Sequence, residues 1–382
     1  MKTKRYILAF AFIFFFILIG TTPCRATEYE EESLPGEYGD FISNLPDYVI
    51  DALPDTALDD NKSSLYEAAD ELSRPTSVLS AILRGFGSQI SNVLPTLAKL
   101  LGIIIISSLS YSLSSSLGEG IGKAMTIVTR LACYVAVCSI TFSTLGDLKD
   151  YFNSLFSAVG SFVPLSAVLY AMGGNLTSAV SEASGISITL AVCEFICTKT
   201  TIPLFCLCLS LTLISMLEGG GGVGVSLSND IKKWYLTSIS FVMLVLTTSL
   251  ASQNILSARA DGVAMRGTKL ALSSFVPLSG GTLSSTLGTL SSSVGLLRGS
   301  VGIIGIAVII LMLMPTIMYL SLLRLCFSFC STLCGLLSCT GEQKLFSELN
   351  NLYGYLIGIS ALSAAVFVIA LAIFAKTATP FG

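Results

Sequence analysis

Long apolar stretches separated by short polar ones dominate the chain from residue 93 onward, and they predict a bundle of membrane-spanning helices. Five stretches come close to the ~20 residues that an α-helix needs to cross a bilayer. They are residues 97–117, 124–145, 155–172, 234–252 and 355–375. The chain is therefore expected to be all-α.

Two further apolar stretches are too long for one span. Residues 186–217 contain Lys199 and Pro203, which predicts either a tight hairpin or a broken helix. Residues 301–337 contain Pro315 and predict two passes. Together these stretches predict a polytopic membrane protein with seven to nine membrane segments, in a multipass domain over residues 93–382.

The first 26 residues have the pattern of a cleavable signal peptide. A basic start is followed by an apolar run from Tyr6 to Ile19 and then by the small residues Cys24 and Ala26. The run is shorter than a full span, so cleavage after Ala26 is favoured over an uncleaved anchor. Residues 27–92 are then expected on the outer side of the membrane.

Residues 27–92 form a different kind of segment, which we call the acidic arm. Prolines interrupt its first half, which predicts an extended chain with at most short helices. A capping-box pattern at Ser64 predicts a short helix that ends before Pro75. Apolar residues at helical spacing over 78–94 then predict either an amphipathic helix on the membrane surface or part of a small helical bundle packed on the membrane domain.

Composition supports the membrane assignment and excludes several kinds of chemistry. Hydrophobic residues make up 53% of the 382, charged residues only 12%, and the mean hydropathy is +0.80. The chain has no histidine, which excludes Ser-His-Asp and Cys-His catalysis and histidine-bound zinc or haem. The net charge is +4 over residues 1–26, −11 over the acidic arm and +4 over the remainder. The basic surplus is too small and scattered for nucleic-acid binding.

A seven-residue repeat between Gly281 and Val308 predicts a helix-packing seam. Its glycines recur every seven residues, and its aliphatic positions alternate by four and three, as in a helix–helix interface. The members we single out are Gly281, Gly288, Gly295, Gly302, Leu283, Leu287, Leu290 and Val294. Small residues let helices approach closely in lipid. The seam is expected either to pack within the chain or to contact another subunit, as in a homo-oligomer, or a partner membrane protein.

Two charged residues lie deep within the apolar stretches. Arg130 and Glu194 are costly in hydrocarbon unless they pair, so we expect an ion pair between them. The eleven cysteines are spaced like packing residues rather than cluster ligands, and we expect no metal site, no cofactor and no disulfide framework.

Two short blocks of sequence resemble the stage III sporulation protein AE family. The upstream block is Ala171-Met172-Gly173-Gly174, followed by Ser178-Ala179. The downstream block is Ala260-Asp261-Gly262-Val263-Ala264, followed by Arg266, Lys269 and Pro277 and, further on, by Ser300-Val301-Gly302. Residues 255–275 around the downstream block are amphipathic and predict either an interfacial helix or a docking loop.

The resemblance implies a multipass protein of the mother-cell membrane around the forespore of endospore-forming bacteria. It also implies membership in a channel-like or secretion-like complex with other sporulation membrane proteins, embedded in the lipid bilayer, and implies no catalytic residue. An independent permease for a small solute is the alternative function, because residues 186–217 are interrupted and Glu194 is charged. A membrane enzyme is the least favoured class, since no nucleophile is paired with a base.

Overall fold

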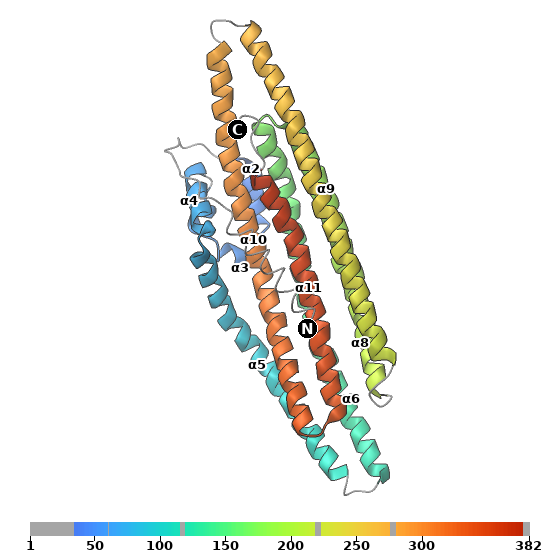
Figure 1. Ribbon diagram of the computed structural model, residues 1–382. Coiled ribbons are helices and arrows are strands. Elements are labelled where there is room, and N and C mark those ends of the chain that lie inside the picture. Colours follow the sequence, from blue (N-terminus) through green and yellow to red (C-terminus); the bar gives the residue numbers. More distant parts are fainter. Residues whose placement is uncertain (1–33, 60, 115–118, 218–222, 276–279, 377–382) are drawn as a thin grey trace.

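A computed structural model describes residues 34–59, 61–114, 119–217, 223–275 and 280–376, and these residues are almost entirely helical (Figure 1). No strand occurs in these ranges. The elements are α2 (Gly36–Ser43), α3 (Asp47–Ile50), the 3₁₀-helix η1 (Asp55–Ala57), α4 (Lys62–Ser73), α5 (Pro75–Ser114), α6 (Glu119–Met172), α7 (Leu176–Glu194), the π-helix η2 (Phe195–Thr201), α8 (Ile202–Leu217), α9 (Val223–Phe275), α10 (Gly280–Leu336) and α11 (Thr340–Lys376). The predicted signal peptide lies outside the described residues.

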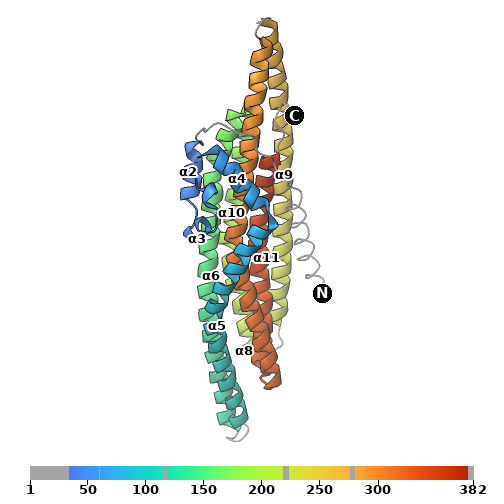
Figure 2. The same ribbon diagram turned by 90° about the vertical axis from the view of Figure 1, so that its left-hand side faces the viewer.

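Six helical segments of the described chain are long and apolar enough to cross a membrane. They are residues 89–113, 127–172, 176–215, 224–264, 293–336 and 340–376. Figures 1 and 2 show them side by side in an elongated bundle, with the α9–α10 pair projecting at one end and the α5–α6 pair at the other. The predicted all-helical, membrane-like character is confirmed. The described residues contain six candidate spans, fewer than the seven to nine that the sequence predicts.

The difference in number comes from two places where a predicted break is absent. Helix α6 runs through the polar residues between the predicted spans 124–145 and 155–172, because Leu148, Phe152 and Leu155 keep one face buried at helical spacing. Helix α10 likewise continues through Pro315 instead of folding back into two passes. Each pair of predicted spans is therefore one long helix.

Residues 186–217 also follow a single helical path, so the predicted hairpin does not form. The interruption is the π-helix η2, which ends two residues before Pro203, a residue that cannot donate a backbone hydrogen bond. The Thr200 and Thr201 hydroxyls donate to the carbonyl oxygen of Ile196 at 2.7 and 2.9 Å. The broken-helix alternative is the closer description.

The described part of the acidic arm is folded against the bundle and is not extended. Phe41 of α2 packs edge-on against Phe162 of α6 with ring centroids 5.6 Å apart, and the Tyr38 hydroxyl donates to the carbonyl of Ala57 at 2.7 Å. Apolar side chains of α2 to α4 are buried, which offsets the entropy of ordering so acidic a segment. Helix α4 begins after the cap Asn61, three residues before the predicted start, and ends before Pro75 as predicted.

The helices divide into an inner and an outer set. In α6, α10 and α11, at least half of the apolar stretch that could cross the membrane is buried within the protein. The buried share is 61% in α11 and only 22% in α9. The inner set is held by aromatic contacts such as Phe162–Phe374, 5.2 Å between centroids, and Phe156–Phe367, 6.2 Å. Helices α5, α7, α8 and α9 cover this core and expose apolar side chains outward.

Candidate functional site at the junction of helices α6, α7, α9 and α10

The upstream family-like block forms the turn between α6 and α7. Gly174 has a φ of 76°, a conformation that favours glycine. Its N–H donates to the carbonyl of Ala171 at 2.9 Å, and the N–H of Asn175 donates to the carbonyl of Tyr170 at 3.0 Å. This pair of bonds is the Schellman ending of a helix and lets α7 start immediately after α6.

Asp261 of the downstream block caps the start of α7 from across the bundle. Its two carboxylate oxygens accept the backbone N–H of Thr177 at 3.0 Å and of Ser178 at 2.8 Å. Asn175 occupies the N-cap position without making a side-chain cap bond, so Asp261 takes over that task. A carboxylate at this position also meets the positive end of the helix dipole. Asp261 is only 3% exposed, which strengthens the charge-assisted bonds.

A second buried contact lies about two helical turns away along the same face of α9. The Asn254 amide donates to the Glu182 carboxylate of α7 and lies 3.4 Å from the hydroxyl of Tyr170 on α6. Residues 254 and 261 are seven apart and therefore face the same way. Helix α9 thus binds α7 at two levels through polar side chains.

Arg298 of α10 completes the cluster, which we call the polar junction: Tyr170, Glu182, Asn254, Asp261 and Arg298. The guanidinium carbon lies 4.5 Å from the centre of the Tyr170 ring and 6.0 Å from that of Phe374. Arg298 is also close enough to Glu182 for their opposite charges to attract. Arg298 and Glu182 are 2% and 5% exposed, so the pair is removed from solvent.

The junction joins four helices through groups that bond to one another and to the backbone. Within the described ranges, no group of three or more His, Cys, Asp or Glu side chains could hold a metal ion. A buried pair of opposite charges is costly to disrupt, because removing one partner leaves the other unpaired. The chemistry of this site therefore favours fixing the relative positions of helices.

The other residues of the two family-like blocks lie around the junction. Of the downstream block, Asp261 points inward, while Ala260, Val263, Ala264 and Arg266 are exposed on α9 and Gly262 has open space beside it. Of the upstream block, Gly173 is buried and faces Val294, whereas Ala171 and Met172 are exposed. The side chain of Lys269, and Pro277 altogether, lie outside the described part of the chain.

The predicted seam lies on α10, and its described part packs within the chain. A Cβ atom added to Gly302 would lie 2.6 Å from the Cβ of Ala375 on α11, so only glycine fits there. Val294 borders Gly173, and Gly295 is half-buried. The side chains at five seam positions lie outside the description: Gly281, Leu283, Leu287, Gly288 and Leu290.

The expected ion pair between Arg130 and Glu194 does not form. The guanidinium of Arg130 lies against Gly341 at the start of α11, where an added Cβ would come within 3.0 Å of its Nε. Glu194 is exposed at the end of α7. Arg130 is thus half-buried against α11 while Glu194 is exposed, and no ion pair joins these two described residues, so the expected bridge is absent.

Sequence reasoning overlooked Glu182, Asn254 and Arg298. Glu182 falls in the gap between the predicted segments 155–172 and 186–217. Arg298 lies just before the predicted apolar stretch from residue 301, although it is the single charge within the repeat. Treating both as intramembrane charges of opposite sign would have identified a candidate pair.

Comparison with known proteins identifies the family from the sequence as a whole. The family described as Stage III sporulation protein AE matches residues 65–378, which includes all six long helices. No match is found among curated proteins or among solved structures. The two blocks that carried the resemblance are the ones that Asp261 brings together. The chain belongs to the stage III sporulation protein AE family.

Proposed function

We propose that this protein is a non-catalytic membrane component of the channel-like or secretion-like complex that joins mother cell and forespore and is required for endospore formation. The observation that carries the proposal is the family match over residues 65–378. Six apolar helical segments support a place in the membrane. The buried polar groups of the junction support a structural role, since they join α7 to α9 by hydrogen bonds and contact α6 and α10 through Tyr170 and Arg298.

In this proposal the acidic arm lies outside the cytoplasm, in the space between the mother-cell and forespore membranes. The arm follows a predicted signal peptide, and its high negative charge disfavours contact with hydrocarbon. The membrane is that of the mother cell, where it surrounds the forespore. Lys232 and Lys233 then lie toward the cytoplasmic end of α9, as the positive-inside rule favours, whereas Arg259 and Arg266 near its other end favour the opposite orientation.

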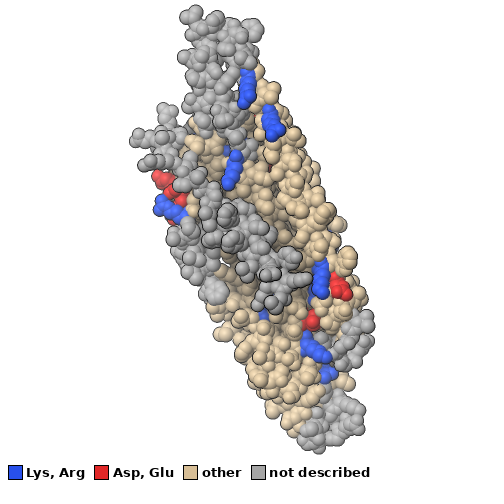
Figure 3. Space-filling model, viewed as in Figure 1, with Lys and Arg blue, Asp and Glu red and all other residues tan. Residues whose placement is uncertain are grey.

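An exposed apolar surface supports contact with lipid and with other membrane proteins of the complex. It runs along α7 and α9, where Val180 is 73% and Leu256 is 66% exposed. Figure 3 shows the α9 side of the molecule as a long uncharged surface between two groups of charged side chains. Lipid tails and apolar partner helices are the environments in which such a surface is stable.

One of the two arguments for the alternative function, an independent permease, does not agree with the structure. It required an inward-facing charge in residues 186–217, and Glu194 is exposed on the outside of the bundle. The π-helix η2 is the remaining feature in its favour, because irregular helices often line transport sites. Uptake of a solute by the chain reconstituted alone would favour the permease.

Deleting the gene in its spore-forming host tests the proposal. We expect a large loss of heat-resistant spores, restored by a wild-type copy expressed in the mother cell, and a fluorescently tagged copy located around the forespore. Vegetative growth provides the control and should be unchanged. Normal spore counts in the deletion strain, or an even distribution of the tagged copy over vegetative membranes, would contradict the proposal.

A further inference from the structure

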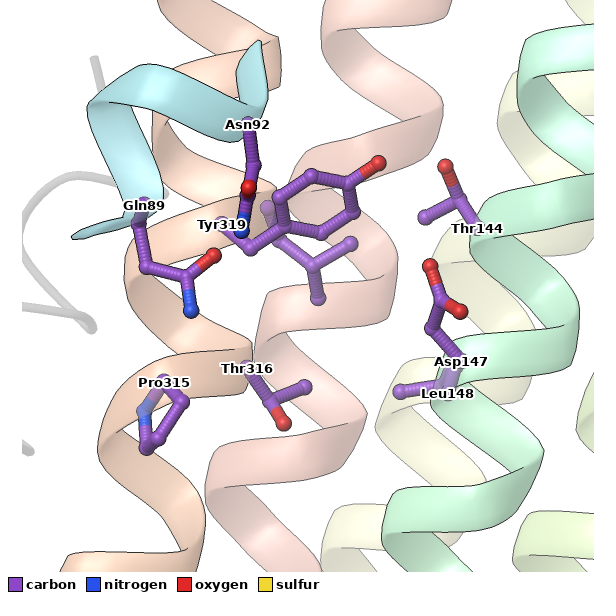
Figure 4. Close-up of a pocket in the computed structure, with 9 residues that line it drawn as sticks. Gln89, Asn92, Thr144, Asp147, Leu148, Pro315, Thr316 and Tyr319 are labelled. Carbon is purple, nitrogen blue, oxygen red and sulfur yellow. The ribbon is translucent and has the colours of Figure 1, made fainter. Parts of the chain in front are cut away.

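A polar cavity lies between α5, α6 and α10, away from the polar junction (Figure 4). Its volume is about 360 Å³, within the range of small-molecule pockets. Gln89 and Asn92 enter it from α5, Thr144 and Asp147 from α6, and Thr316 and Tyr319 from α10. The cavity lies near the middle of the apolar segments 127–172 and 293–336.

The lining combines one negative charge with several hydrogen-bonding groups. Asp147 is the charged member among the described lining residues. Two amides and three hydroxyls surround it, and Figure 4 shows the Tyr319 ring reaching across the cavity toward Thr144. Asp147 is exposed, so its carboxylate is open to a ligand, and it lies beside the polar lining at the level of two apolar segments, where a charged residue marks a site for a polar or charged ligand.

Helix α10 contains a proline at the same point. Pro315, which lines the cavity, has no N–H and cannot donate to the carbonyl of Leu311 one turn earlier. A proline in the middle of a long helix leaves the carbonyl group four residues earlier without its helical hydrogen-bond donor. No basic side chain is among the described lining residues, so the Asp147 carboxylate meets no positive charge within the lining.

We propose that this cavity binds a small molecule through a primary ammonium group, which pairs with the Asp147 carboxylate. The Tyr319 and Thr316 hydroxyls and the Gln89 and Asn92 amides bind the polar remainder of the ligand. Leu148, Leu320 and the Pro315 ring contact its methylene groups. This binding goes beyond the proposed function, because it requires neither the complex nor its partners.

Binding of radiolabelled 1,4-diaminobutane and lysine to the full chain in phosphatidylglycerol nanodiscs tests the proposal. We expect saturable binding that Asp147→Asn weakens by roughly ten- to a hundredfold, the value of a charge-assisted bond. Asp230→Asn is the matched control, since Asp230 is exposed on α9 and does not line the cavity. Unlabelled 1-butanol, which lacks the ammonium group, should not compete.

A lipid headgroup can supply the same ammonium chemistry as a soluble amine. Repeating the measurement with phosphatidylethanolamine in the nanodiscs separates the two sources. Loss of amine binding would assign the site to the lipid headgroup, and unchanged binding would assign it to the soluble amine; both support recognition of ammonium by Asp147.

Should Asp147→Asn fail to fold, Asn92→Ala and Tyr319→Phe carry the same test with an expected loss of about tenfold each. Asn92 is exposed, so its replacement should leave folding intact. Failure of the wild-type chain to bind either amine in phosphatidylglycerol nanodiscs would overturn the proposal. Equal binding by the wild type and a folded Asp147→Asn variant would overturn it as well.

Discussion

Single residues of the polar junction connect segments that are far apart in the sequence. Asp261 accepts two backbone N–H groups that lie more than eighty positions earlier, and the Asn254 amide donates to the Glu182 carboxylate 72 positions earlier. The N-cap residue of α7, Asn175, makes no side-chain cap bond, so the first N–H groups of α7 depend on this distant carboxylate. Such pairings cannot be read from local sequence, because nothing near residue 177 indicates which helix supplies the cap.

Replacing Asp261 with alanine should destabilise the protein by about 2 kcal/mol, since two buried bonds to a helix start are lost. The measurement is thermal unfolding in detergent, followed with a thiol-reactive dye, because the described cysteines are free and mostly buried. Asp230→Ala is the control: Asp230 is on the same helix, exposed, and 3.9 Å from Lys233. Equal melting temperatures of the Asp261→Ala and Asp230→Ala proteins would refute the capping role.

The pair formed by Glu182 and Arg298 should show strong coupling. Replacing either residue with leucine removes one of two opposite charges that attract each other in a buried site and should cost roughly 3–5 kcal/mol, whereas replacing both should cost less than the sum. The double-mutant cycle is measured by the same unfolding assay. Strictly additive effects would mean that the two charges do not interact.

Whole elements were predicted well where the apolar pattern is continuous and poorly where polar residues interrupt it. The apolar stretches correctly indicated long helices. The polar residues 146–154 suggested a loop, yet Leu148 and Phe152 continue the buried stripe of α6 through it. The first half of the acidic arm has only short helices, as predicted, but it is not extended, because apolar side chains at helical spacing, such as Tyr38 and Phe41, are buried against the rest of the protein.

The packing of α10 on α11 predicts that alanine changes stability in opposite directions at two glycines one helical turn apart. Gly302→Ala places a methyl group 2.6 Å from the Cβ of Ala375 and should destabilise by about 1–3 kcal/mol. Gly299→Ala meets its nearest atom at 3.9 Å and should stabilise by up to about 1 kcal/mol, since alanine favours a helix. Melting temperatures shifted in the same direction by both substitutions would contradict this packing.

At the scale of the whole molecule, the helices are much longer than a membrane is thick. Helix α9 has 53 residues, which corresponds to roughly 80 Å, against about 30 Å for the hydrocarbon core. The bundle must therefore extend beyond the bilayer. The acidic arm packs on α6 at Phe162, on the half of the bundle that also contains the polar junction. Beyond that half, the α9–α10 pair projects furthest (Figure 2).

This arrangement predicts where the C-terminal end of α11 lies. Phe374 packs on Tyr170 with ring centroids 5.4 Å apart, so α11 ends on the same side as the start of α7 and the acidic arm. Alkaline phosphatase fused after residue 382 should be active, and the same enzyme fused after Leu217, at the opposite end, should be inactive. An inactive C-terminal phosphatase fusion together with a fluorescent C-terminal GFP fusion would place this end in the cytoplasm and contradict the proposed orientation.

The central claim is that the protein works as a subunit of a sporulation membrane complex. Its most direct test is affinity purification of the tagged full chain from sporulating cells after mild solubilisation, with quantitative mass spectrometry of the proteins that accompany it. We predict other sporulation membrane proteins in amounts comparable to the chain itself, and their absence from a mock purification of untagged cells. A functional tagged chain that purifies alone, from cells that form normal spores, would contradict the claim.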